Sequence, residues 1–110
     1  EGFAIDGYYR DDKTSREILA FLEEDGCRWQ LVDKDSSCVD GQFKRTDDPN
    51  ILILKKENGE EFGTVHVAYI SRRRNQGQIY LIRNTKVTRF YLVSTDPAFT
   101  VGSGDVDADV

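Results

Sequence analysis

The sequence predicts an α+β domain in which one N-terminal amphipathic helix packs on an antiparallel β-meander sheet. Three observations predict it: a helix-capping pattern followed by apolar residues at helical spacing, several short apolar strands after it, and turn-forming pairs between those strands. With 110 residues, 38% of them apolar, the chain suits a single hydrophobic core. We expect one domain over residues 1–95 and an acidic, disordered tail over residues 96–110.

The helix is predicted from Ser15 to Asp25. Thr14 and Glu17 have the spacing of a capping box, and Gly26 suits a helix C-terminus. The acidic end of this segment opposes the helix dipole, so packing of its apolar side chains must hold it. Four apolar residues carry the helical spacing: Ile18, Leu19, Phe21 and Leu22.

The chain after Gly26 is predicted as strand and turn. Residues 33–50 are polar and predicted as a long loop, with room for a short strand at Gln42–Lys44. Both faces of the later strands are apolar, so both need cover, and one helix can cover only one of them. The N-terminal segment, the long loop or a partner must cover the other. The main predicted strands are Cys27–Val32, Ile51–Lys56, Phe62–Ser71, Gln78–Arg83 and Thr88–Thr95.

The pair Asn58-Gly59 predicts a tight type I′ hairpin turn between two of these strands. Such a turn fixes which residues face one another across the hairpin. The expected pairs are Leu52 with Val65, Ile51 with His66, and Lys56 with Glu61.

The net charge of −5 is unevenly distributed along the chain. Residues 1–61 hold 16 acids and 9 bases, residues 62–95 hold 6 bases and no acid, and residues 96–110 hold 4 acids and no base. The acid-free block predicts a local positive field and a site for an anion, phosphate above all. The alternative is that its cations only discourage edge-to-edge pairing of strands. The cations are Arg72, Arg73, Arg74, Arg83, Lys86 and Arg89.

The order of short motifs over residues 7–70 resembles that of an SH2 domain. Tyr8-Tyr9-Arg10 comes first, Thr14-Ser15-Arg16-Glu17 opens the predicted helix, and a short apolar strand, Ser36-Ser37 and the strand with His66 and Ile70 follow. The resemblance implies that Arg16 contacts the phosphate of phosphotyrosine, that Ser36 and Ser37 form the phosphate-binding loop, and that His66 lies beside the phosphotyrosine ring. The sequence departs from the family at Asp33, which stands where the family has its buried strand arginine.

Catalytic patterns are missing from the sequence. No Gly-rich phosphate loop, HExxH or G-x-S-x-G string occurs, and the single histidine lies between valines, where a packed or surface histidine is usual. We therefore expect no enzyme and no cofactor. Cys27 and Cys38 match no zinc spacing and are expected to be free thiols, although a disulfide, which would favour a secreted protein over a cytoplasmic one, remains open.

These observations lead to a hypothesis of a non-catalytic protein-interaction module that binds a phosphorylated or acidic peptide through a basic patch. The alternative is single-stranded nucleic-acid binding by the basic, aromatic strands over residues 62–95. Most of the aromatic residues there, Tyr69, Tyr80, Phe90 and Tyr91, are expected in the core. No run is long and apolar enough for a transmembrane segment, so no membrane partner is expected. Since the chain contains no methionine, we expect it to be a segment of a longer protein.

Overall fold

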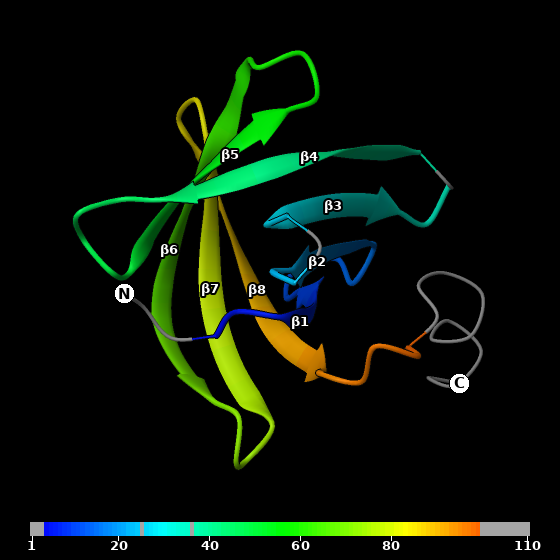
Figure 1. Ribbon diagram of the computed structural model, residues 1–110. Helices are drawn as coiled ribbons and strands as arrows, with labels where there is room; N and C mark the ends of the chain where they lie inside the picture. The colour runs from blue at the N-terminus through cyan, green and yellow to red at the C-terminus, as the bar shows by residue number, and fades with distance from the viewer. Residues whose placement is uncertain (1–3, 25, 36, 100–110) are drawn as a thin grey trace.

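Eight antiparallel strands follow one another in chain order and close into a barrel in the computed structural model (Figure 1). The structure describes residues 4–24, 26–35 and 37–99. Each strand pairs with the next, and β8 pairs back with β1, so closure leaves no open sheet edge. The strands are β1 (Gly7–Asp11), β2 (Glu17–Leu22), β3 (Arg28–Asp33), β4 (Cys38–Arg45), β5 (Ile51–Lys56), β6 (Glu61–Ser71), β7 (Gln76–Arg83) and β8 (Lys86–Ser94).

The predicted α+β class is wrong, because the segment expected to be a helix forms β2. Thr14 does not cap a helix. Its hydroxyl donates to a carboxylate oxygen of Asp11 and accepts from the backbone N–H of Arg16 at 3.1 Å, which closes the turn between β1 and β2. Ser15, where the helix was predicted to begin, has a φ of 59°, far from the right-handed helical region.

Tertiary pairing explains why β2 is a strand. Its apolar residues fit a helical stripe, yet Leu19 and Phe21 also fit the two-residue period of a strand, and both are buried inside the barrel. As a strand, the segment pairs with β1 on one side and with β3 on the other. A lone helix of this length would be marginal in water, so the two ladders decide the conformation.

The predicted long loop over residues 33–50 is also corrected, because it contains the eight-residue strand β4. Between β5 and β6, the turn at Asn58-Gly59 is confirmed, as are the Leu52–Val65 and Ile51–His66 pairs. The Lys56–Glu61 pair is wrong, since a bulge after Leu54 places Lys55 opposite Glu61. Gly59 is the one residue of this turn with a positive φ. A type I′ turn requires two such residues, so the turn is not of the predicted type.

Closure of the barrel gives each strand one inward, apolar face. An eight-stranded barrel is just wide enough for side chains to fill it, and here large side chains do so. The second face, for which the sequence predicted a helical cover, is the outside of the barrel. The core consists of Ile5, Tyr9, Leu19, Phe21, Trp29, Leu31, Phe43, Leu52, Leu54, Val65, Val67, Ile79, Leu81, Phe90 and Leu92.

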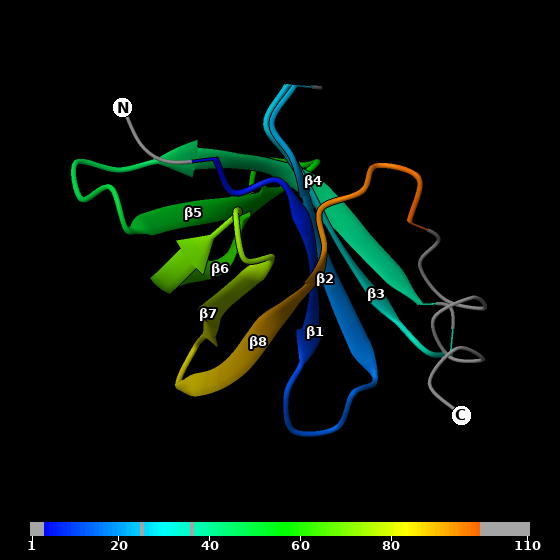
Figure 2. The ribbon, with the colours of Figure 1, turned by 90° about the horizontal axis from the view of Figure 1, so that it is seen from below.

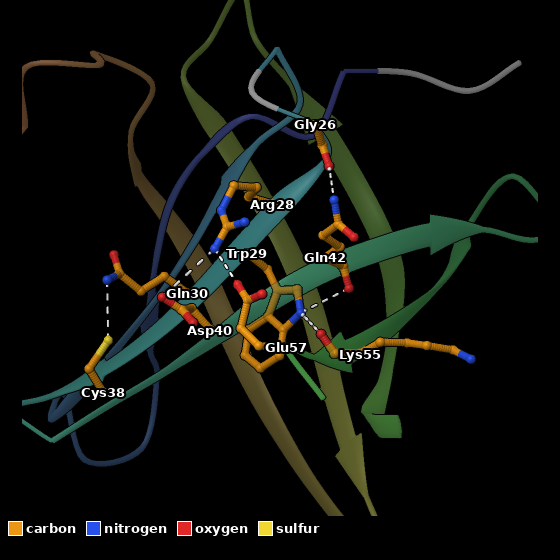
Figure 3. A network of polar contacts seen from close by, with 9 residues as sticks. All are labelled: Gly26, Arg28, Trp29, Gln30, Cys38, Asp40, Gln42, Lys55 and Glu57. Atoms are coloured by element: carbon orange, nitrogen blue, oxygen red, sulfur yellow. Dashed lines mark hydrogen bonds and ion pairs between the residues drawn. The ribbon is translucent and has the colours of Figure 1, made fainter. Parts of the chain in front are cut away.

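Trp29 is fixed inside the barrel by two backbone carbonyls (Figure 3). Its indole N–H donates to the carbonyl oxygens of Gln42, at 3.1 Å, and Lys55, at 2.9 Å. Gly41 lies opposite Trp29 on β4, and a Cβ atom there would lie 1.9 Å from the Lys55 carbonyl oxygen. The glycine therefore allows the close approach of β4 and β5 that brings this carbonyl to the indole.

Successive turns alternate between the two ends of the barrel. The turns after β1, β3, β5 and β7 form one end, which we call the hairpin end. The turns after β2, β4 and β6 form the other, the terminal end, where the described chain also begins and β8 finishes. Figure 2 shows β1–β4 on one side of the molecule and β5–β8 on the other.

Beyond β8, Phe99 packs on Tyr8 of β1 with ring centroids 4.8 Å apart. The rest of the predicted tail, from residue 100 onwards, lies outside the described residues. Over residues 4–24, 26–35 and 37–99, the structure contains no helix long and apolar enough to cross a bilayer.

Candidate functional site

The acid-free block of the sequence becomes one continuous side of the barrel. It supplies β6, β7 and β8, which are neighbours in the closed sheet. Glu61, the first residue of β6, is the single acidic residue of these three strands. We call the outward side chains of β6–β8 the outer wall. The residues of the acid-free block therefore also lie together on one surface of the folded protein.

Aromatic side chains stand in register across the outer wall. His66 lies opposite Tyr80, which lies opposite Arg89 on the next strand. In a second row, Gln78 lies between Tyr69 and Tyr91. A bulge between Val67 and Tyr69 changes the register there. Tyr69 is 50% exposed and Tyr91 is 36% exposed.

The expectation that most aromatic residues of this block lie in the core is therefore wrong. Phe90 is fully buried, but Tyr69 and Tyr91 are exposed and Tyr80 is partly exposed. Inward Phe90 is flanked in sequence by outward Arg89 and Tyr91, as strand periodicity requires. Three tyrosines on one exposed surface are a feature of binding faces.

Polar contacts orient two side chains of the outer wall. Gln78 Nε2 donates to the Tyr80 hydroxyl at 2.9 Å. Arg89 Nε donates to Asp12 Oδ2 at 2.9 Å, and Nη2 donates to the same oxygen. This hydrogen bond and the charge of Asp12 raise the pKa of Arg89 above its already high usual value. Asp12 therefore holds the Arg89 side chain in place, and its negative charge offsets that of the arginine at the edge of the outer wall.

The six predicted cations do not form one patch. Arg72, Arg73 and Arg74 lie in the turn after β6 at the terminal end, where Arg72 Nη1 donates to the Asp6 carbonyl at 2.8 Å. Arg83 and Lys86 face each other across the turn after β7, at the hairpin end. The eight residues of β7 span about 26 Å between the two groups. The aromatic residues of the outer wall lie between them.

The residues to which the SH2 resemblance assigns roles do not all meet, because His66 lies apart from Arg16 and Ser37. Arg16 Nη2 lies 2.9 Å from Asp33 Oδ1, so its charge is engaged by that aspartate. Ser37 lies next to this pair, and its backbone N–H donates to Asp35. His66 belongs to β6, which neighbours neither β2 nor β3. Ser36 lies outside the described residues.

A second group of charged residues lines a pocket of about 380 Å³ at the hairpin end, which we call the end pocket. Of the residues that line it, the sequence predicted only Arg83 and Ser37 as ligand-binding residues. It missed Glu17, assigned to a capping box, and Phe62, which had no recognisable role. Arg83 Cζ lies 4.0 Å from the centroid of the Phe62 ring, and that ring lies 4.7 Å from Trp29.

Glu17 has the most perturbed surroundings in the end pocket. Burial raises its pKa above the usual value, and the nearby Asp11 and Asp33 raise it further, whereas Lys86 and Arg83 lower it. The carboxylate of Asp11 is hydrogen-bonded within the turn between β1 and β2, where it accepts from the backbone N–H of Lys13 at 2.8 Å. Glu17 makes no ion pair within 4.0 Å in the described part of the chain.

Within residues 4–24, 26–35 and 37–99, no three His, Cys, Asp or Glu side chains are grouped as metal ligands would be. Comparisons with protein-family models, with curated proteins and with solved structures find no match for this chain. Its function must therefore be argued from the outer wall and the end pocket.

Proposed function

We propose that this chain is a non-catalytic protein-interaction module whose outer wall binds an acidic or tyrosine-phosphorylated segment of a partner. The observation that carries the proposal is the group of three tyrosines on β6–β8, two of them exposed and one partly exposed, on strands that contain one acid among them. Tyrosine supplies a large, stiff contact area that loses little conformational entropy on binding. The flanking arginines supply charge-assisted hydrogen bonds to carboxylates or phosphates.

Charge distribution favours an acidic peptide over a nucleic acid on the same wall. The whole chain carries a charge of −5, which repels a long polyanion that extends past the wall. Arg89 is already paired with Asp12, and the remaining cations lie toward the two ends. A short acidic segment can contact the tyrosines and one arginine cluster without extending over residues 1–61, which hold 16 acids and 9 bases. Single-stranded nucleic acid remains the competing ligand, since tyrosines and arginines also stack on bases.

The test compares three fluorescein-labelled probes by anisotropy: a glutamate–tyrosine copolymer, the same copolymer after tyrosine phosphorylation, and single-stranded oligo(dT). The proposal expects binding of a copolymer, and weaker binding by the Tyr69→Ser/Tyr91→Ser and Arg73→Gln/Arg74→Gln variants. The matched control is Lys13→Gln/Lys44→Gln, which removes the same charge outside the wall. Tighter oligo(dT) binding that weakens steeply with salt would establish the nucleic-acid alternative instead. No binding of either copolymer would refute the proposal.

A further inference from the structure

The end pocket holds one acid and one base that are not neutralised by neighbours. Two acids and two bases line it. Asp33 is paired with Arg16, and Lys56 is paired with Glu60 at 3.3 Å. This leaves Glu17 and Arg83, for which the described residues provide no ion-pair partner within 4.0 Å. Two opposite charges therefore face the same small space without contacting each other.

The remaining lining of the end pocket is partly apolar. Leu31, Val39 and Phe62 line it together with Ser37 and Cys38. Leu31 is almost fully buried and belongs to the core, so the end pocket lies directly against the hydrophobic interior. The volume of about 380 Å³ lies within the range of small-ligand sites, roughly 300–1,000 Å³.

We propose that the end pocket binds a small zwitterion with an apolar side chain, an α-amino acid of the leucine type. Glu17 receives the ammonium group, Arg83 receives the carboxylate, and the side chain rests on Leu31, Val39 and Phe62. A purely anionic ligand would meet the carboxylate of Glu17, and a purely cationic one would meet Arg83. Only a molecule with both charges can pair with the partly buried Glu17 and the exposed Arg83 at the same time.

Through Phe62, Arg83 couples ligand binding in the end pocket to the fluorescence of Trp29. Its guanidinium lies over Phe62, whose ring contacts Trp29, the single tryptophan of the chain. A carboxylate that draws Arg83 toward itself alters the stacking on Phe62. Ligand binding should therefore change Trp29 fluorescence, and titration calorimetry measures the same binding without relying on that signal.

The experiment uses three probes that separate the two charges: L-leucine, L-leucinamide, which lacks the carboxylate, and N-acetyl-L-leucine, which lacks the ammonium. The wild type should bind L-leucine tightest. Glu17→Gln should weaken binding of L-leucine and leucinamide about tenfold each and should not weaken binding of the anionic N-acetylleucine, which loses a repulsion. Arg83→Gln should weaken binding of L-leucine and N-acetylleucine similarly and should not weaken binding of the cationic leucinamide. Glu24→Gln and Lys44→Gln, the matched controls outside the end pocket, should change none of the three.

Three outcomes would overturn the proposal. One is the absence of calorimetric heat and fluorescence change with all three probes up to millimolar concentrations. Another is an equal loss for all three probes in both variants, which would indicate a structural role for the two residues. The third is tighter binding of O-phosphoethanolamine than of L-leucine, because that zwitterion has no apolar side chain. The outer wall is not involved, so this result is independent of the peptide-binding test.

Discussion

Arg16 and Asp33 form an ion pair across the hairpin end, with Nη2 of the arginine 2.9 Å from Oδ1 of the aspartate. The aspartate stands where the SH2 resemblance expects the strongest phosphate-binding arginine. The pair thus holds the one arginine to which the resemblance assigns a phosphate contact. A phosphate dianion at Arg16 would meet the negative charge of Asp33, which already accepts a hydrogen bond from this arginine.

We therefore predict that Arg16→Ala leaves binding of the phosphorylated copolymer within twofold of wild type, whereas Arg73→Gln/Arg74→Gln weakens it. The unfolding free energy should fall by less than about 1 kcal/mol, because the Arg16 side chain is half exposed. Anisotropy and urea unfolding measure the two effects. A severalfold loss of phosphopeptide binding in Arg16→Ala would show that phosphate does reach this arginine.

Gly41→Ala should destabilise the barrel by about 3 kcal/mol or more. The added Cβ would lie 1.9 Å from the Lys55 carbonyl oxygen, which cannot move without breaking its hydrogen bond to Trp29. Urea unfolding followed by Trp29 fluorescence measures the loss. Gly59→Ala is the control, because its Cβ meets nothing within 4 Å and only the positive φ costs energy, about 1–2 kcal/mol. Equal stability of the two variants would contradict the close-approach argument.

β3 and the later strands could be predicted from sequence, whereas β1 and β2 could not and β4 only over Gln42–Lys44, for a physical reason. β5–β8 are rich in β-branched and aromatic residues and are bounded by turn-forming pairs, so local signals suffice. In β2, Ile18, Leu19, Phe21 and Leu22 have helical spacing, Leu19 and Phe21 also have the spacing of one strand face, and only the partner strands decide between the two. In β4, the core position opposite Trp29 is a glycine, which removes one of the apolar residues by which a strand is recognised.

The candidate sites could be predicted only in part. The acid-free block correctly marked one side of the molecule, because three consecutive strands of a meander are also neighbours in space. The division of its cations between two ends follows from the predicted antiparallel meander, because successive turns of a meander lie at opposite ends. The sequence could not show the end pocket, where Glu17 of β2, Phe62 of β6 and Arg83 of β7 meet only because the sheet closes.

Glu17→Gln should stabilise the protein at neutral pH, and this gain should vanish in acid. The folded-state pKa of Glu17 is raised from its ordinary value of 4.5, chiefly by burial. Below that ordinary value, the carboxyl is protonated in folded and unfolded chains alike and costs nothing. As pH rises through the window between the two pKa values, the unfolded chain releases its proton first, so the stability of the wild type falls.

Paired urea unfolding curves of wild type and Glu17→Gln at about pH 7 and about pH 4 test this sign. The variant should have the higher midpoint at the first pH and an equal midpoint at the second. Other titrating groups, such as Asp6, are present in both proteins and cancel in the comparison. A variant that is less stable at neutral pH would mean that Arg83 and Lys86 outweigh the burial of Glu17.

The two cysteines should remain reduced within one molecule even under oxidising conditions. Cys38 pairs with Val32 at the start of β4, whereas the carbonyl of Cys27 accepts from Phe43 N–H at the other end of the same hairpin. Five residues of strand separate Cys27 from Val32, or about 17 Å, while a disulfide requires Cα atoms within roughly 7 Å. The disulfide that would have argued for a secreted protein therefore has no geometric basis in this fold.

Thiol labelling followed by mass spectrometry measures this prediction. Cys38 is exposed and should react first, and Cys27, which packs against the core, should react on slower opening of the turn before β3. Cys38→Ser should remove the fast phase and leave the slow one. An intramolecular disulfide in the folded, oxidised protein would require β3 and β4 to shift by several residues, and would contradict the register that places Trp29 opposite Gly41.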